Sequence, residues 1–319
     1  MKRVFVYEYL SGGGEAGSEL LAMGQSMRDA IVTDLIALED YDVSVATCSL
    51  APNVPEPAKP VRAQPLEAPF DFVARHADTH HFVWVVAPET EELLTRFQRC
   101  VDPARWLGCD GAAIQLASGK RRTLLALADA GVTTPLAFEH APEITRWVVK
   151  PDDGAGALDT RLHRSLEAAS EDWSQRSRAG RPMAIEPWVE GAALSLSLMC
   201  SPGRAELLSI NRQHIRIDAD GVLAYEGVEV NALPLTRRRS TAPAAEPRAA
   251  ALRALAARVG HCMPGLCGYV GIDLVWHAQR GPVVIEVNPR VTCAYVGLSR
   301  ALGRNLAADV IAACGRSRA

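Results

Sequence analysis

The sequence has little that would suit a nucleic-acid or membrane partner. Its 319 residues include 34 Lys and Arg against 37 Asp and Glu, a formal net charge of −3 at pH 7. No basic excess therefore argues for binding to nucleic acid. No segment approaches the roughly 20 apolar residues that cross a bilayer. The apolar run near the N-terminus is too short for a signal sequence and contains Glu8. We expect a soluble, cytoplasmic protein.

Paired thiols and the usual nucleophile arrangements are missing too. The eight cysteines include no CxxC pair and no zinc-binding spacing. No Cys–His or Ser–His–Asp arrangement stands out. Scattered cysteines in a chain of this size are typical of reduced thiols in the core of an intracellular protein. What the chain does have is 48% hydrophobic residues, enough for large cores in two or three sub-domains.

The most informative stretch is residues 268–290, GYVGIDLVWHAQRGPVVIEVNPR. Its residues alternate in two runs, which predicts two strands joined by a tight turn. With the turn centred on Gln279 and Arg280, Asp273 faces Glu286 across the pair, and Asn288 lies on the same face as Glu286. Two carboxylates and an amide oxygen then converge, a set of hard ligands that suits Mg²⁺. A hairpin with one solvent-exposed, acidic face and no bound metal fits the same pattern.

The first hundred residues alternate between strand-like and helix-like patterns. We expect a strand at 3–9, a helix at 18–38, strands at 41–48 and 81–87, and a helix at 89–99. A strand, a turn, a helix and a second strand make a βαβ unit, so this part predicts a small α/β layer. The glycine turn after the first strand could bind an anion at the helix N-terminus, or it could be only a tight turn.

A lysine followed by small residues marks a second candidate site. Residues 147–151 predict a strand that carries Lys150, and the next loop contains Gly154 and Gly156. An ammonium group beside a flexible loop can cradle a triphosphate, although a solvated lysine before a polar loop gives the same pattern. Further on, alternation at 193–200, 207–210 and 215–217 predicts an antiparallel sheet with one buried face.

Five features follow one another along the chain: Lys120, Lys150 with its glycine loop, EPWVEG at 186–191, Asp273, and EVNPR at 286–290. In this order they resemble the ATP-grasp superfamily over about residues 110–300. The resemblance implies a fold of mixed α/β and α+β character. An N-terminal α/β domain (1–108) would precede a two-lobed nucleotide-binding region, with a small lobe at 109–192 and a C-terminal lobe at 193–319. It also implies a ligase that phosphorylates a carboxylate with ATP and lets an amine attack the acyl phosphate.

The same resemblance implies roles for individual residues. ATP would be held by two phosphate-binding lysines, a closing loop and an adenine-binding hinge: Lys120 and Lys150, Gly154 and Gly156, and Glu186, Trp188 and Val189. Two Mg²⁺ ions, or Mn²⁺, would be held by Asp273, Glu286 and Asn288, and Arg290 would steady the transferred phosphoryl group. Many members have an acidic ribose contact where this sequence has Ala193.

A narrower resemblance rests on VYEYLSGGG near the N-terminus and on LLSINRQHI at 207–215, which are similar to the tyramine–glutamate ligases of methanofuran biosynthesis. It implies a γ-glutamyl amide product, with tyramine or tyrosine as the amine. Two alternatives stay open: an ATP-grasp ligase of the D-alanine–D-alanine or peptide-tailing type, and a non-catalytic nucleotide-binding protein. A homodimer is compatible with either.

The last expectation concerns the acceptor substrate. Ligands of open α/β sheets gather beyond the carboxyl ends of the strands, where the first glycine turn must lie. We expect Glu8, Gly12, Gly13 and Gly14 to border this site, with the glycine amides on a substrate carboxylate and Glu8 on an ammonium group. Arg212 would act from the opposite wall on the carboxylate or acyl phosphate. Alternatively, Glu8 and Arg212 form an internal ion pair.

Overall fold

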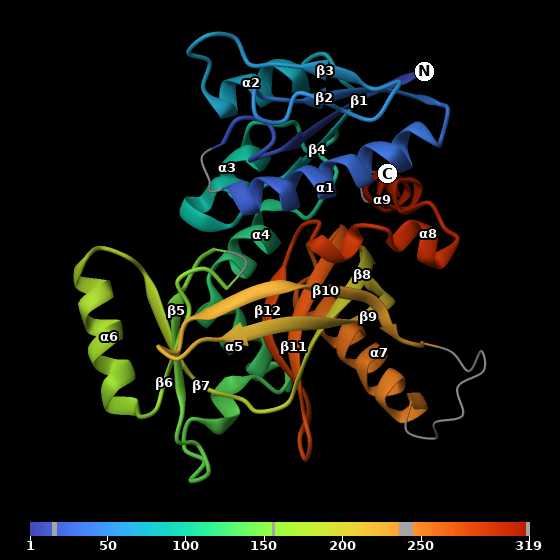
Figure 1. The fold of residues 1–319 in the computed structure, drawn as a ribbon. Helices are drawn as coiled ribbons and strands as arrows, with labels where there is room; N and C mark the ends of the chain where they lie inside the picture. The colour runs from blue at the N-terminus through green and yellow to red at the C-terminus, as the bar shows by residue number, and fades with distance from the viewer. Residues whose placement is uncertain (15–17, 155–156, 236–244, 317–319) are drawn as a thin grey trace.

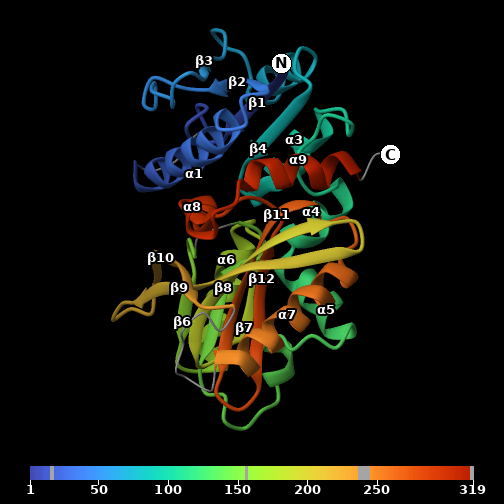
Figure 2. The ribbon, with the colours of Figure 1, turned by 90° about the vertical axis from the view of Figure 1, so that its right-hand side faces the viewer.

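The computed structural model describes residues 1–14, 18–154, 157–235 and 245–316. Within those residues the strands form sheets of four, five and three strands. The four-stranded sheet and its helices lie at one end of the molecule, and the other two sheets lie together below it (Figure 1). The turned view in Figure 2 shows the same two tiers. The predicted mixed fold, with an α/β layer first and antiparallel sheets after it, is confirmed.

The first sheet is parallel, with the order β3-β2-β1-β4. Its elements are β1 Lys2–Glu8, α1 Ser18–Ile36, β2 Tyr41–Ala46, β3 Lys59–Val61, α2 Pro69–Ala77, β4 Phe82–Val86, the 3-10 helix η1 Thr90–Glu92 and α3 Leu93–Arg99. Val4 and Val6 of β1 share a core with Ile31 of α1, whereas Phe5 shares the other core with Phe72 of α2. Because both faces are covered, β1 is almost continuously apolar.

The three-stranded sheet is antiparallel and has the order β6-β5-β7. Its strands are β5 Trp147–Pro151, β6 Arg161–His163 and β7 Met183–Pro187, and helix α6 Leu166–Arg178 runs between the last two. Val149 of β5 and Ala169 of α6 share a small core with Met183 of β7. The elements that precede this sheet in the chain are α4 Gly111–Ser118, α5 Lys120–Asp129 and the 3-10 helix η2 Pro135–Phe138.

The five-stranded sheet is antiparallel, in the order β10-β9-β8-β11-β12. Its strands are β8 Ala192–Ser201, β9 Arg204–Ile217, β10 Leu223–Leu233, β11 Gly268–His277 and β12 Gly281–Asn288. Helix α7 Ala245–Cys262 covers one face, where Leu196 of β8 and Leu252 of α7 share the core. The 3-10 helix η3 Cys293–Tyr295 and helices α8 Leu298–Leu302 and α9 Leu306–Arg316 close the described chain.

Two expected elements differ in the structure. The strands expected at 207–210 and 215–217 are one strand, β9, because the polar residues between them continue the sheet pairing with β8 and β10. The sequence pattern over 298–313 predicts one closing helix, but the structure interrupts it after Leu302, where Gly303 adopts a left-handed φ of 63° that few residues other than glycine adopt. Both differences come from backbone conformations that apolar periodicity does not report.

The two antiparallel sheets are linked at their edges and enclose a cleft. The amide of Leu162 in β6 donates to the carbonyl of Gly221, and the amide of Leu223 in β10 donates to the carbonyl of Thr160. The cleft measures about 1650 Å³ and reaches up to the carboxyl ends of β1 and β4. Among the described residues, no helix is both long and apolar enough to span a bilayer.

Candidate active site

The acidic centre of the cleft lies on the β11–β12 hairpin. Asp273 pairs directly with Glu286, as the alternation predicts, and the side-chain amide of Asn288 donates to Asp273 Oδ2 over 3.2 Å. Gln213, on β9, donates from Nε2 to Asp273 Oδ1 over 2.9 Å. The predicted pairing and the shared direction of these side chains are therefore confirmed, and Gln213 is a contact that the sequence analysis missed.

A β-bulge produces this pairing. The loop is the three residues 278–280 between His277 and Gly281, not a turn centred on Gln279 and Arg280. Such a loop would set Asp273 opposite Ile285, but the register shifts between Asp273 and Leu274. Ile285 is the extra residue, and both it and Glu286 line the cleft. Bulges of this kind are frequent beside active sites, where they redirect a side chain.

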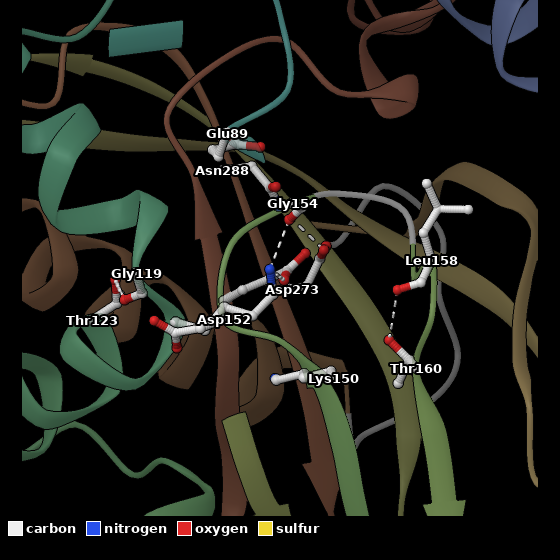
Figure 3. A network of polar contacts seen from close by, with 12 residues as sticks. Glu89, Gly119, Thr123, Lys150, Asp152, Gly154, Leu158, Thr160, Asp273 and Asn288 are labelled. Atoms are coloured by element: carbon white, nitrogen blue, oxygen red, sulfur yellow. Dashed lines mark hydrogen bonds and ion pairs between the residues drawn. The ribbon is translucent and has the colours of Figure 1, made fainter. Parts of the chain in front are cut away.

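Two lysines enter the cleft from different elements. Lys120, the first residue of α5, has its Nζ 3.4 Å from Glu286 Oε2 and donates over 2.7 Å to the carbonyl of Gly154. Lys150 of β5 has its Nζ 2.8 Å from Glu186 Oε2. Both lysines are buried. Figure 3 shows Lys150 below the group formed by Gly154, Asp273 and Asn288.

Asp152 ties the glycine loop to the start of α5. Its backbone carbonyl accepts from the amide of Lys120, and its carboxylate accepts from the amide of Arg121, each over 2.9 Å. These contacts satisfy two of the amides that a helix N-terminus leaves unpaired. Figure 3 shows Asp152 beside Gly119 and Thr123 at this helix end. A capping residue distant in sequence from its helix gives no local signal, so the sequence analysis did not find it.

The two facing carboxylates share charge unequally. Burial, and then the negative charge of Glu286, raise the pKa of Asp273 well above its ordinary value. Burial would raise the pKa of Glu286 as well, but Lys120 and then Lys150 outweigh it and lower that pKa. Asp273 therefore keeps its proton to a higher pH than Glu286 does.

The repulsion between the carboxylates of Asp273 and Glu286 bears on whether the site suits a metal ion. The carboxylates of Asp273 and Glu286 face each other across the strand pair, and a divalent ion would offset the repulsion between them. The oxygen donors of Asp273, Glu286 and Asn288 match Mg²⁺, which takes one or two carboxylates and completes its shell with phosphate oxygens and water. Among the described residues, no cluster of three or more His, Cys, Asp or Glu could hold a metal by itself. A site completed by substrate phosphates fits these residues.

Arg290, two residues beyond Asn288, is held in the cleft by an acidic partner that the sequence analysis missed. Its Nε and Nη2 donate to the two carboxylate oxygens of Glu89 over 2.9 and 3.0 Å, and Nη1 donates to the carbonyl of Val291 over 3.1 Å. Glu89 lies just beyond the carboxyl end of β4. Parallel sheets commonly place functional residues beyond the carboxyl ends of their strands, and this position is the sequence signal that could have indicated a role for Glu89.

The expected hinge residues also border the cleft. Glu186, Trp188 and Val189 all line it, at and just after the end of β7. Within the described part of the chain, Glu186 Oε1 and Trp188 Nε1 are buried without a hydrogen-bond partner. Buried polar atoms are normally paired, so these two atoms suit a ligand that supplies a donor and an acceptor.

Comparison with known proteins agrees with this geometry. A family model described as an ATP-grasp domain matches residues 117–294, and one described as a pre ATP-grasp 3 domain matches residues 41–114. The chain belongs to the ATP-grasp family. The predicted superfamily is therefore confirmed.

Curated relatives and solved structures extend the match over most of the chain. It is 27% identical over 302 residues to the tyramine–L-glutamate ligase of Methanocaldococcus jannaschii, covering 92% of this chain and 84% of that protein. It is 31% identical over 219 residues to the same ligase of Methanocaldococcus fervens, covering 68% and 61%. An ATP-grasp superfamily protein from Archaeoglobus fulgidus shares the fold, with a TM-score of 0.70 at 21% identity over 98% and 88% of the two chains. These matches confirm the predicted ligase class.

The glycine turn of this ATP-grasp protein does not present its amides to the cleft. The amides of Gly12, Gly13 and Gly14 donate to the carbonyls of Glu8, Leu10 and Tyr9, respectively. None of the three glycines lines the cleft. The expected contact between these amides and a substrate carboxylate is therefore wrong, because the turn uses the same amides for its own hydrogen bonds.

Glu8 does line the cleft, although it also closes the turn. Its carboxylate accepts from the amides of Leu10 and Ser11 over 3.2 and 2.8 Å. Helix α1 passes so close that a Cβ on Gly24 would lie 2.6 Å from the carboxylate. Burial raises the pKa of Glu8, while the hydrogen bonds from Ser11 and Leu10 partly oppose that shift. The structure thus brings Glu8 to the cleft in a rigid position.

Arg212 is not part of the cleft. Along β9 the side chains alternate, so Gln213 faces Asp273 while Arg212 projects from the other face. Its Nη1 lies 3.6 Å from Glu229 Oε2, and both side chains are 53% exposed. Both sequence-based hypotheses for Arg212, the acceptor wall and the ion pair with Glu8, are therefore wrong. Gly156 of the loop lies outside the described residues.

Proposed function

We propose that this protein is an ATP-dependent ligase that joins a carboxyl group of glutamate to an aromatic amine, tyramine or tyrosine, through an acyl phosphate. The observation that carries the proposal is the meeting of Lys120, Lys150, Asp273, Glu286 and Arg290 in one cleft. The tyramine–L-glutamate ligases that the chain resembles support the choice of acid and amine. That resemblance also supports a place in the synthesis of a methanofuran-type cofactor.

Phosphoryl transfer to a carboxylate needs positive charge around the moving phosphoryl group. Negative charge spreads over its oxygens in the transition state, and little covalent work by side chains is required. Lys120 and Lys150 supply two ammonium groups from α5 and β5, and Arg290 supplies a guanidinium from the end of the hairpin. In this proposal the lysines hold ATP phosphates and Arg290 steadies the transferred group.

The acidic centre would hold the metal that accompanies ATP. Asp273, Glu286 and Asn288 would bind Mg²⁺, as one or two ions, or Mn²⁺, and the ion would neutralise charge on the phosphate oxygens. Gln213 keeps the carboxylate of Asp273 oriented through Oδ1. Lys120 balances Glu286 from the other side at 3.4 Å.

Adenine would lie at the end of β7. The unpaired Glu186 Oε1 and Trp188 Nε1 offer an acceptor and a donor to the base, beside the apolar side chain of Val189. Ala193 lines the same cleft without an acidic group, and Glu190 pairs with Arg146 instead of entering it. Neither Ala193 nor Glu190 offers an acidic contact to ribose, so in this proposal other residues of the cleft bind the ribose.

The amine would occupy the side of the cleft next to the parallel sheet. Leu20 and Met23 of α1 line it together with Tyr225 of β10 and Cys293 of η3, and Cys293 Sγ lies 4.0 Å from Met23 Sδ. Thioether and aromatic groups pack well around an aromatic ring. Glu8, at the end of β1, gives this apolar compartment one carboxylate for an ammonium group.

Three further expectations, on domain division, location and oligomeric state, remain proposals. We retain the division into an N-terminal domain (1–108), a small lobe (109–192) and a C-terminal lobe (193–319), because these boundaries separate the three sheets apart from Ala192, the first residue of β8. A cytoplasmic location remains a proposal, supported by the scattered spacing of the eight cysteines in the sequence. A homodimer stays a prediction that sedimentation can check.

A substrate screen tests the proposal. Purified protein with ATP, Mg²⁺ and glutamate should release ADP and phosphate when tyramine or tyrosine is added, and mass spectrometry should detect the glutamyl amide. Lys120→Met and Lys150→Met should lose ADP formation, whereas Lys59→Met, an exposed lysine paired with Asp42, should keep it. ADP formation with D-alanine alone would favour the D-alanine–D-alanine type. ATP binding without turnover over a broad panel would favour a non-catalytic protein.

A further inference from the structure

The buried ion pair between Glu89 and Arg290 joins the parallel sheet to the acidic hairpin. We propose that Glu89 is a positioning residue, which holds the guanidinium of Arg290 toward the phosphoryl group and keeps it off the metal-binding carboxylates. The proposal rests on the proposed function for the role of Arg290. Its consequence for metal binding does not depend on the identity of the acid or the amine.

The geometry of the pair fixes the plane of the guanidinium. Two parallel hydrogen bonds of 2.9 and 3.0 Å link Nε and Nη2 of Arg290 to the two oxygens of Glu89, and the side chains are 10% and 4% exposed. A bidentate contact of this kind leaves the guanidinium little freedom to rotate. The partners are 201 residues apart, so the pair is a product of the fold.

The remaining donors of Arg290 suit the proposed role. A guanidinium has five N–H groups. Two are bonded to Glu89 and one, on Nη1, to the carbonyl of Val291. Among the residues that the structure describes, one N–H on each Nη nitrogen is left for other partners. Because Arg290 lines the same cleft as Asp273 and Glu286, these two donors are available to oxygens of the phosphoryl group.

Charge competition explains why an acidic partner is needed. Arg290 lines the same cleft as Asp273 and Glu286 and lies just beyond the end of β12, the strand that carries Glu286. A guanidinium released from Glu89 would be drawn to those carboxylates and would occupy the place of a divalent cation. Glu89 gives it a competing partner on the other side of the cleft. The same contact therefore orients Arg290 and leaves the metal site open.

The segment that carries Glu89 also contacts the glycine loop. The amide of Glu91 donates to Asp153 Oδ2 over 2.9 Å, and a Cβ on Gly154 would lie 3.0 Å from Thr90 Oγ1. Glu91 adopts a left-handed φ of 52°, and so does Glu92 at 58°. Such conformations persist in non-glycine residues only where the surroundings hold them. The docking on Asp153 is one such restraint, and it keeps the backbone next to Glu89 in place.

Metal binding and kinetics of three variants test the proposal. Glu89→Gln should weaken Mn²⁺ binding, followed by electron paramagnetic resonance, and should lower kcat, each by about tenfold to a hundredfold, as loss of an outer-shell partner does elsewhere. The KM for ATP should change much less. Glu89→Asp keeps the charge and should recover part of both losses. The matched control is Glu92→Gln, in the same segment and 59% exposed, which should resemble the wild type.

The outcomes separate this inference from the proposed function. If Glu89→Gln binds Mn²⁺ and turns over like Glu92→Gln, Glu89 does not position Arg290. If Glu89→Asp loses as much as Glu89→Gln while both stay folded by circular dichroism, the charge is not what matters and the proposal also fails. If the wild type forms no glutamyl amide at all, the proposed function fails, and the Mn²⁺ comparison still decides the role of Glu89.

Discussion

Loss of Lys150 should cost more stability than loss of its partner Glu186. The two charges lie 2.8 Å apart, with side chains only 7% and 3% exposed. Lys150 also acts on Glu286, whose pKa it helps to lower. Lys150→Met therefore leaves two buried carboxylates without this ammonium group, whereas Glu186→Gln leaves Lys150 with Glu286 still nearby.

The magnitudes follow from the cost of an uncompensated buried charge. Removing one partner of such a pair costs about 3–5 kcal/mol, and we expect Lys150→Met in this range. Glu186→Gln keeps a hydrogen-bond acceptor for Lys150, so its cost should stay near the value for one charged hydrogen bond, about 1.5–3 kcal/mol. The double variant has no buried charge at this position. It should therefore be no less stable than Lys150→Met alone.

Urea unfolding of the metal-free protein measures these differences, and hydrogen exchange of peptides from β5 and β7 reports whether the loss is local. The ligand-free state is the right one, because nucleotide would add its own stabilisation. Equal costs for the two single variants would contradict the reasoning about Glu286. Additive costs in the double variant would show that the two charges do not interact, and the explanation by an uncompensated buried charge would then fail.

Three further predictions concern other parts of the molecule. Glu286→Gln should abolish ADP formation far more than it weakens ATP binding, measured by calorimetry; equal losses would indicate misfolding. Gly24→Ala would bring a methyl group within 2.6 Å of the Glu8 carboxylate and should lower stability by about 1–3 kcal/mol, while Gly315→Ala, with open space around it, should not. Burial, then Arg75, lowers the pKa of His76 to about 4 from an unfolded value near 6.5, so stability should be lost as the pH falls through that window. His76→Phe should reduce that loss, measured as Tm at pH 7 and pH 5, and an unchanged pH dependence would exclude His76 as its source.

Much of the acidic centre could be predicted from sequence because its residues belong to one hairpin. Alternation assigns the face of each side chain, and a short loop limits the register to a few choices. The pairing of Asp273 with Glu286 followed, although the bulge at Ile285 and the three-residue loop did not. The two errors in loop and register cancelled. A bulge is set by how the strand fits its neighbours, so alternation alone could not show it.

Arg212 shows where this reasoning fails. The polar residues at 211–214 interrupted the apolar alternation, so no strand was assigned there and the face of Arg212 was not determined. In the structure the strand continues through them, and one residue of displacement places Gln213, not Arg212, beside Asp273. The same reasoning fails for the glycine turn. Its sequence indicates accessible backbone amides, but not that the turn bonds those amides to its own carbonyls.

The sequence by itself determined the family, the order of the lysine-bearing and acidic elements and the identity of most charged residues in the cleft. Those features depend on neighbours along the chain, whose spacing sets the face on which a side chain lies. The tertiary structure alone decided that Glu89 holds Arg290, that Asp152 caps α5 and that Lys150 pairs with Glu186. Partners distant in sequence meet because whole sheets pack against one another, and no local periodicity reports which charges that packing brings together.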